Sequence, residues 1–269
     1  MKRLYLLLLC CGLLESTAAQ VSPPAGAAAA EYAFSGYALQ HGMKAAFLQY
    51  TDSGSVIFHE GRVLGARQYW QQAPAPAGKL LWQPVFACTA ADGNSGFTTG
   101  PFEFRKSLQD SVLGCGQYST IWLKNASGEW HFLADLGITY PTSLFNLRPL
   151  QQYNEHLPSA DTSATAVENA FLEQFRHGPQ AALQAVLLPA SWLNINGQHP
   201  FQGPASILAA LRQMPPDITF TPLAGVMAQS RDLAYIYGYT LHGGKQESYL
   251  RVWAHTAGGW KLLLQVLKW

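Results

Sequence analysis

The sequence contains one β-hairpin pattern twice, and this repeat limits the folds that the chain can adopt. Residues 116–137, GQYSTIWLKNASGEWHFLADLG, predict two strands joined by a tight turn at residues 125–128. Residues 247–266, ESYLRVWAHTAGGWKLLLQV, repeat the pattern near the end of the chain. The counterparts of Tyr118, Trp122, Gly128 and Trp130 are Tyr249, Trp253, Gly259 and Trp260. The repeat therefore indicates one domain present twice in tandem.

The composition predicts a folded chain without a nucleic-acid partner. Of the 269 residues, 48% are hydrophobic and 12% are charged, which suits a protein with a large core. The net charge of +1 provides no basic face for a phosphate backbone.

The first residues predict export. Lys2 and Arg3 precede an apolar run over residues 4–14 that is too short to span a bilayer, and small residues follow at 17–19. We expect cleavage near Ala19 and a secreted or periplasmic protein. No later segment reaches membrane-spanning length, so no membrane partner is expected after removal of the signal.

Removal of the signal leaves two cysteines, Cys88 and Cys115. Two cysteines cannot form a disulfide framework, and a domain of this size does not need one. We expect both to be free and buried.

The order of predicted elements also repeats. Each half begins with two helices and continues with a strand, a third helix and a run of strands. We therefore predict a signal peptide at residues 1–19, a flexible leader at 20–30, a first domain at 31–138, a linker at 139–162 and a second domain at 163–269. Helices followed by mainly antiparallel strands favour an α+β fold with helices packed on one face of a curved sheet.

Three runs in the first half carry a family resemblance: HGMKAAFLQY with SVIFHEGRVLG, LLWQPVFACTAADGNSGFTTGPFEFR, and the hairpin itself. With them the chain resembles the nuclear transport factor 2-like superfamily, and within it the SnoaL-like and ketosteroid-isomerase-like families of unknown function (domain of unknown function 4440 type). The likeness covers about residues 31–137 and, more faintly, 165–269. It implies two cone-shaped domains, each a curved sheet wrapped on helices with a pocket at its open end. The superfamily includes isomerases, cyclases, dehydratases and binding modules, so it does not decide the function.

One catalytic feature of the family is missing from this sequence. Steroid isomerases of the superfamily carry a carboxylate base near the end of the first strand. Alignment places Phe58 at that position in the first half and Asn194 in the second. Neither side chain can accept a proton as a carboxylate would, which argues against a simple isomerase.

Pairing the hairpin across a four-residue turn places several polar and aromatic side chains on one face. In that register Trp122 lies opposite His131, Thr120 opposite Leu133 and Tyr118 opposite Asp135. Such a face would suit a binding pocket. A shift of one residue would move Trp130, Phe132 and Ala134 to that face instead.

Asp135 is the leading candidate for a chemical role, and His131 is the second. A carboxylate in an apolar strand is costly unless it is paired or neutral, and a raised pKa would suit a general acid or base. The alternative is a structural hydrogen bond that Asp135 accepts from Tyr118 or from a backbone amide. For His131 the alternative is an exposed histidine at the start of a strand.

Other residues carry weaker signals. Glu103 is a candidate pocket residue, with pairing to Arg105 as the alternative. Tyr249 and Arg251 are the second-half candidates, and the stripe of Tyr235, Tyr237 and Tyr239 favours core or interdomain packing. The mature chain shows no metal-binding or nucleophile motif, so we expect no metal and no cofactor.

The sequence thus predicts an exported tandem protein that binds a small, largely apolar molecule or serves as an accessory module. The alternative is an acid–base enzyme, an isomerase, dehydratase or cyclase, that uses Asp135 and His131. A structural role for the second copy is a third hypothesis. We expect a monomer in which the two copies form an internal pseudo-dimer.

Overall fold

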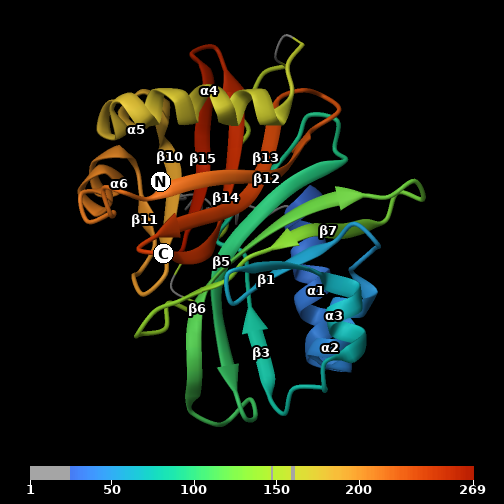
Figure 1. Ribbon diagram of the computed structural model, residues 1–269. Coiled ribbons are helices and arrows are strands. Elements are labelled where there is room, and N and C mark those ends of the chain that lie inside the picture. The colour runs from blue at the N-terminus through green and yellow to red at the C-terminus, as the bar shows by residue number, and fades with distance from the viewer. Residues whose placement is uncertain (1–24, 147, 159–160) are drawn as a thin grey trace, which may run out of the picture.

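A computed structural model describes residues 25–146, 148–158 and 161–269. The fold is α+β and consists of two curved mixed sheets, each covered by its own helices (Figure 1). Both the fold class and the internal duplication predicted from sequence are confirmed. The predicted signal peptide and residues 20–24 of the predicted leader lie outside the described residues.

The first half begins with three helices that cover one face of its sheet. They are α1 (Gly26–His41), α2 (Met43–Gln49) and α3 (Ala66–Gln72). Gly42, at φ 89°, separates α1 from α2 in a conformation that glycine adopts without strain. The buried side of α1 packs Phe34 and Ala38 against the sheet.

The strands of the first half form a sheet in the order β2-β1-β7-β6-β5-β4-β9, with β3 beside β5 and β8 beside β6. Their bounds are β1 (Val56–His59), β2 (Arg62–Gly65), β3 (Lys79–Trp82), β4 (Phe86–Thr89), β5 (Ser95–Arg105), β6 (Val112–Lys124), β7 (Trp130–Asp135), β8 (Ile138–Thr139) and β9 (Gln151–Gln152). β1 pairs with β7 in parallel, while β5, β6 and β7 are antiparallel neighbours.

The second half repeats this plan. Its helices are α4 (Ala164–His177), α5 (Pro179–Val186) and α6 (Pro204–Leu211), and its sheet has the order β11-β10-β15-β14-β13-β12. The strands are β10 (Leu187–Ile195), β11 (Phe201–Gln202), β12 (Thr219–Met227), β13 (Leu233–His242), β14 (Lys245–Thr256) and β15 (Gly259–Leu267). The parallel β10–β15 pair corresponds to β1–β7, and β14–β15 corresponds to β6–β7.

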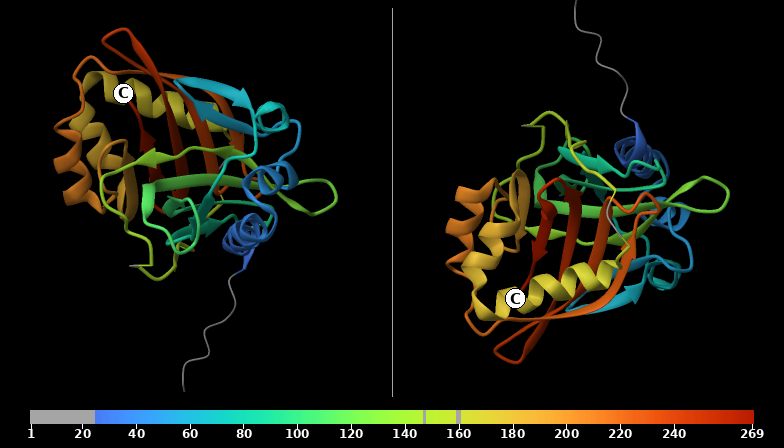
Figure 2. Two further views of the ribbon diagram at one scale, coloured as in Figure 1. Left: turned by 90° about the horizontal axis from the view of Figure 1, so that it is seen from below. Right: turned by 90° about the horizontal axis from the view of Figure 1, so that it is seen from above.

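The two sheets pack on each other through the faces that do not carry helices. The helices of the two halves therefore lie on opposite outer sides, with the strands between them (Figure 2). One hydrophobic cluster contains residues of both sheets, including Phe97, Ile121, Leu250 and Val266. A second cluster fills the first half beneath α1–α3, and a third fills the second half beneath α4–α6.

The tyrosine stripe of β13 belongs to this interface, as the sequence favours. The Tyr235 hydroxyl bonds the Ser95 hydroxyl at 3.1 Å, and the Tyr237 ring meets the edge of Phe58 at 5.7 Å. Asn194 donates to the hydroxyls of Thr99 and Ser119. The two positions at which the family places a base, Phe58 and Asn194, thus face the partner domain.

Polar contacts also join the halves. Asp232 is fully buried and accepts a hydrogen bond from the Ala91 amide at 2.8 Å. His156, in the connector, lies 2.7 Å from the same carboxylate. The connector thereby runs against the second half, where the Leu157 amide also donates to the His255 carbonyl. Cys88 and Cys115 are buried free thiols, as expected.

Three details differ from the sequence prediction. Residues 26–30 are not a leader but the first turn of α1, because alanine favours the helix and Ala27 and Ala28 are buried. The Ala27 amide, which has no partner within the helix, donates to Thr89 Oγ1 at 3.0 Å. The predicted linker contains two short strands of the first sheet, β8 and β9.

The third difference concerns the strand predicted at residues 80–89. It is divided into β3 and β4 at Pro84, which has no backbone N–H for the ladder.

Among the described residues, no helix is both long and apolar enough to cross a membrane.

Candidate functional site

A cavity opens inside the first domain, between α1, α2 and the concave face of the sheet. Its volume is about 110 Å³. Its lining consists of apolar side chains with a few polar groups: Glu31, Phe34, Phe47, Leu80, Trp82, Phe102, Tyr118, Thr120, Asp135 and Gly137. Apolar walls with a small number of converging polar groups are typical of small-molecule sites.

Glu31 lies at the buried end of the cavity. It is fully buried on α1, and its carboxylate accepts hydrogen bonds from Trp82 Nε1 at 2.5 Å, Trp122 Nε1 at 3.0 Å and the Thr98 hydroxyl. Burial raises the pKa of Glu31 from 4.5 to about 7, although these three hydrogen bonds act in the opposite direction. The charge of Asp135 also raises the Glu31 pKa. The Glu31 carboxyl therefore titrates near neutral pH.

Asp135 faces the same cavity from β7. It is partly buried, and its Oδ1 accepts a hydrogen bond of 3.1 Å from Thr120 Oγ1 on β6. Burial raises the pKa of Asp135 from 3.8 to about 6 against the opposing effect of that bond. Two carboxyl groups thus line one small cavity.

Tyr118 adds an unpaired hydroxyl. Its ring is buried, and its hydroxyl lies near the Thr98 side chain without forming a hydrogen bond of standard geometry among the described residues. Burial raises the pKa of Tyr118, so the hydroxyl remains neutral and available to a ligand. A buried polar group without a partner is costly, which is one indication of a site that a ligand completes.

The register of the hairpin explains which side chains reach the cavity. The connecting loop has five residues, 125–129, closed by a bond from the Asn125 amide to the Glu129 carbonyl at 2.9 Å. A β-bulge then adds one extra residue, Leu133, to β7. The predicted register is therefore wrong by one residue near the loop and by two beyond the bulge. Because side chains alternate with a period of two, the second shift returns Asp135 to the predicted face.

His131 lies before the bulge and is therefore on the wrong side. It pairs with Leu123 rather than Trp122, and its Nε2 lies 3.0 Å from Asn125 Nδ2. It lines a separate surface groove with Glu129 and Trp130. Leu133 likewise leaves the concave face and packs toward the interface between the sheets. The predicted pairing of His131 with Asp135 in one site is wrong.

The other predicted residues divide between the two halves. Tyr118 and Thr120 line the cavity, and Trp122 lies beneath it as a donor to Glu31. Glu103 points away from the cavity and forms an ion pair with Arg105 at 2.6 Å, which was the alternative expectation. Tyr249 and Arg251 are fully buried in the second domain.

The second domain contains the same buried acid, with an arginine side chain beside it. Glu168 on α4 accepts hydrogen bonds from Trp253 Nε1 at 2.9 Å and the Tyr249 hydroxyl at 3.0 Å, and it forms an ion pair with Arg251. Arg251 Nε donates to Gln265 Oε1 at 2.8 Å. The guanidinium occupies the space beneath α4 and is fully buried.

The two acids, Glu31 and Glu168, were not singled out in the sequence. A signal was present, because each lies three residues before a buried phenylalanine, in EYAF at 31–34 and ENAF at 168–171. Thr165 and Glu168 also match a capping-box pattern, which predicts a role for the second acid at the N-terminus of the helix. The observed N-cap is Ser163, whose hydroxyl accepts from the Ala166 amide at 3.1 Å.

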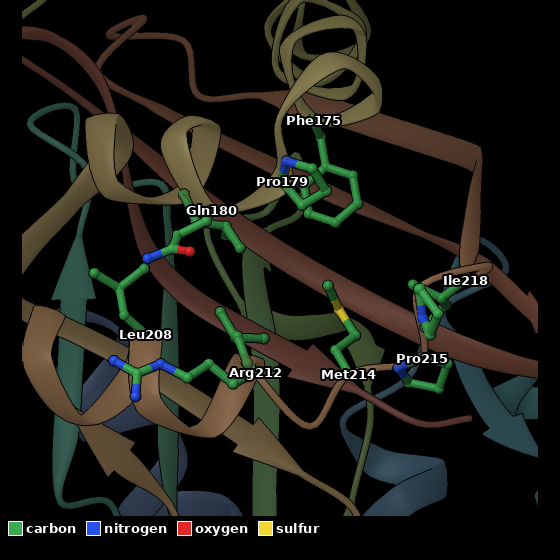
Figure 3. A pocket seen from close by; sticks show the side chains of 11 residues that line it. Phe175, Pro179, Gln180, Leu208, Arg212, Met214, Pro215 and Ile218 are labelled. Carbon is green, nitrogen blue, oxygen red and sulfur yellow. The ribbon is translucent and has the colours of Figure 1, made fainter.

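A different cavity, of about 170 Å³, lies at the edge of the second domain between α5, α6 and the start of β12 (Figure 3). Phe175, Leu208, Met214 and Ile218 supply apolar walls, and the exposed Arg212 lies at its rim. It contains no buried acid. Among the described residues, no cluster of three or more His, Cys, Asp or Glu side chains could hold a metal ion.

The fold and the cavity define a protein of two α+β domains, the first of which contains a cavity lined by two carboxyl groups. Several solved structures are similar to one half of this chain. Nuclear transport factor 2 from Cryptosporidium parvum is 15% identical, with a TM-score of 0.36, over 43% of this chain and 98% of its own. A candidate ketosteroid isomerase from Parabacteroides distasonis is 17% identical, with a TM-score of 0.33, over 44% of this chain and 87% of its own.

A nuclear transport factor 2-like protein of unknown function from Shewanella oneidensis is 16% identical, with a TM-score of 0.32, over 39% of this chain and 94% of its own. A scan against protein-family models finds no match, and neither does a search of curated proteins.

Proposed function

We propose that the first domain binds a small, largely apolar molecule that carries a polar group, in the cavity between α1, α2 and the sheet. The observation that carries this proposal is the contrast between the two copies. In the first, apolar walls surround Glu31, Asp135 and the unpartnered Tyr118 hydroxyl. In the second, the equivalent space is filled by Arg251.

Gly137 offers a direct test, because it lines the cavity. A Cβ atom at this position would meet no atom closer than 3.8 Å, so a larger side chain can enter the cavity without straining the backbone. Gly137→Leu should abolish binding of benzyl alcohol, benzamide and benzamidine as detected by ligand-observed NMR. Gly114→Leu is the matched control, since Gly114 has open space around it and lies outside the cavity lining. Equal signals from both variants would contradict the proposal.

A second candidate function is acid–base catalysis in the same cavity. The observation that favours it is a pair of carboxyl groups whose pKa values are raised to about 7 and about 6, because a catalytic acid or base works best near the ambient pH. Asp135 would serve as the base or acid in an isomerase, dehydratase or cyclase, with Glu31 rather than His131 as its partner. Once a substrate is known, Asp135→Asn should lower the rate by ~10²–10⁴-fold if the protein is an enzyme. A binding protein would retain most of its affinity.

The location outside the cytoplasm belongs to the same proposal and is supported by the signal pattern of residues 1–19. Mass spectrometry of the exported protein should give a first residue of Gln20. A mature chain that retains Met1 would contradict it.

A further inference from the structure

The Arg251 side chain is a buried cation in the second domain. Its guanidinium forms an ion pair with Glu168, and its Nε donates to Gln265 at 2.8 Å. The planar group lies 4.3 Å from the ring centre of Phe220 and 4.8 Å from that of Tyr249. Cations are attracted to aromatic faces at such distances. The result is a fully buried cation, paired at one end and flanked by rings.

The first domain retains much of this arrangement but has no cation. The β-bulges of β7 and β15 align Thr120 with Arg251 and Asp135 with Gln265. Glu31 corresponds to Glu168, and both accept a bond from the indole of an equivalent tryptophan. The Thr120 side chain ends at a hydroxyl, whereas that of Arg251 ends at a guanidinium, and the cavity lies beside Thr120. Among the described residues, neither Glu31 nor Asp135 forms an ion pair with a lysine, an arginine or a histidine.

We propose that the first-domain cavity binds a planar organic cation, a guanidinium or amidinium with a small apolar body, in the manner in which Arg251 occupies the second domain. This inference rests on the proposed binding function and specifies its ligand class. A guanidinium presents several N–H donors in one plane, which suits two carboxyl groups. The apolar body would lie against Phe34, Leu80 and Phe102.

Such a ligand would also supply a positive charge to the two carboxyl groups of the cavity, which makes its binding depend on pH. The titratable groups that face it are Glu31 from α1, Tyr118 from β6 and Asp135 from β7, and the walls contributed by α2, β3 and β5 are apolar. A cation favours the ionised carboxylates, so binding should release protons and strengthen as the pH rises. The affinity of a neutral ligand, which has no charge to favour the ionised carboxylates, would depend much less on pH.

Calorimetry with propylguanidinium and its neutral isostere propylurea tests the inference on the unmodified mature protein. Propylguanidinium should bind at pH 8 at least tenfold more tightly than propylurea. A Glu31 pKa of about 7 means that the affinity should fall by about thirtyfold between pH 8 and pH 5.5. Glu31→Gln should weaken binding of the cation at pH 8 by at least thirtyfold, because glutamine, like the protonated acid, carries no charge. Glu103→Gln is the matched control and should leave binding unchanged, because Glu103 is a buried acid that faces away from the cavity.

Thr120→Arg provides a second line of evidence, since it should place a guanidinium in the cavity and abolish binding of the probe. If propylurea binds as tightly as propylguanidinium, the cation inference is overturned and the binding function stands. If neither probe binds, but benzyl alcohol binds wild type and not Gly137→Leu, the cation inference alone fails. If no probe binds, both fail. Should Thr120→Arg not fold, the comparison of the two probes on the unmodified protein still decides.

Discussion

Replacement of Glu31 by glutamine should change how the stability of the protein depends on pH. A fully buried acid whose folded pKa is raised binds a proton more tightly in the native state than in the unfolded state. The free energy of unfolding therefore falls as the pH rises from about 4.5 to about 7, and it is level above that range. Glutamine cannot ionise, so Glu31→Gln removes this loss.

The magnitude follows from the pKa. Each pH unit between the ordinary value of 4.5 and about 7 corresponds to about 1.4 kcal/mol, which gives a total of about 3 kcal/mol. At pH 4 the variant should be less stable than the wild type by about 1–2 kcal/mol, because the glutamine amide would face one of the donors Trp82, Thr98 or Trp122. At pH 8 it should be as stable as the wild type or more so. Asp135 titrates in both proteins, so only its electrostatic coupling to Glu31 differs between them.

Urea unfolding between pH 4 and pH 8, followed by tryptophan fluorescence, measures this difference. Urea is preferable to guanidinium chloride, because guanidinium is itself a candidate ligand. Glu168→Gln is the matched control at the equivalent position of the second domain. It should cost about 3–5 kcal/mol at pH 8, because it leaves Arg251 buried without its counter-ion. A Glu31→Gln variant that loses the same stability at pH 4 and pH 8 would refute the reasoning.

Three further predictions concern the second domain and the assembly. Arg251→Met should destabilise the protein by about 3–5 kcal/mol at pH 8 in urea unfolding, because it leaves Glu168 buried without its counter-ion. Asp232→Asn should cost about 1–3 kcal/mol at pH 7, because the carboxylate that accepts from Ala91 and pairs with His156 is lost. Although burial alone would raise it, hydrogen bonds from His156 and Ser230 hold the pKa of Asp232 at about 2, so this cost should be present above pH 4 and shrink as the pH falls toward 2. Light scattering should give a monomer, since the helix-free sheet face of each half is covered by the other half; a stable dimer would contradict that expectation.

The secondary structure could be predicted well because local patterns determine it. The order of two helices, a strand segment, a third helix and a run of strands was predicted for both halves and agrees with the structure. Alanine-rich residues 26–30 were misassigned because low complexity was given more weight than the helix propensity of alanine. The short strands β8 and β9 could not be predicted, since each is held by a neighbour distant in sequence.

The site was harder to predict because both faces of the sheet are buried. Strand β6 is almost continuously buried from Cys115 to Trp122, with helices on one side and the second sheet on the other. The usual alternation of apolar and polar residues is then absent, and the sequence contains no marker for the face on which a residue lies. His131 was misplaced for that reason. Glu31 was overlooked because an acid is rarely fully buried in a protein.

The two domains share one buried acid and differ in the polar residues next to it. A buried glutamate on the first helix occurs in both, and in both it accepts a hydrogen bond from a buried indole. Glu31 therefore has a structural explanation and is not by itself an indication of a ligand. The distinguishing pair is Thr120 with Asp135, where the second copy has Arg251 with Gln265.

In the second copy this pair neutralises the glutamate and fills the space. In the first it adds another acid, leaves a cavity and leaves the Tyr118 hydroxyl without a partner. The second copy shows that the same fold accommodates Arg251 and Gln265 beside the buried glutamate, although Arg251 Nη2 is itself buried without a hydrogen bond. The first cavity, where Glu31, Asp135 and Tyr118 converge, is therefore where we propose that binding or catalysis takes place.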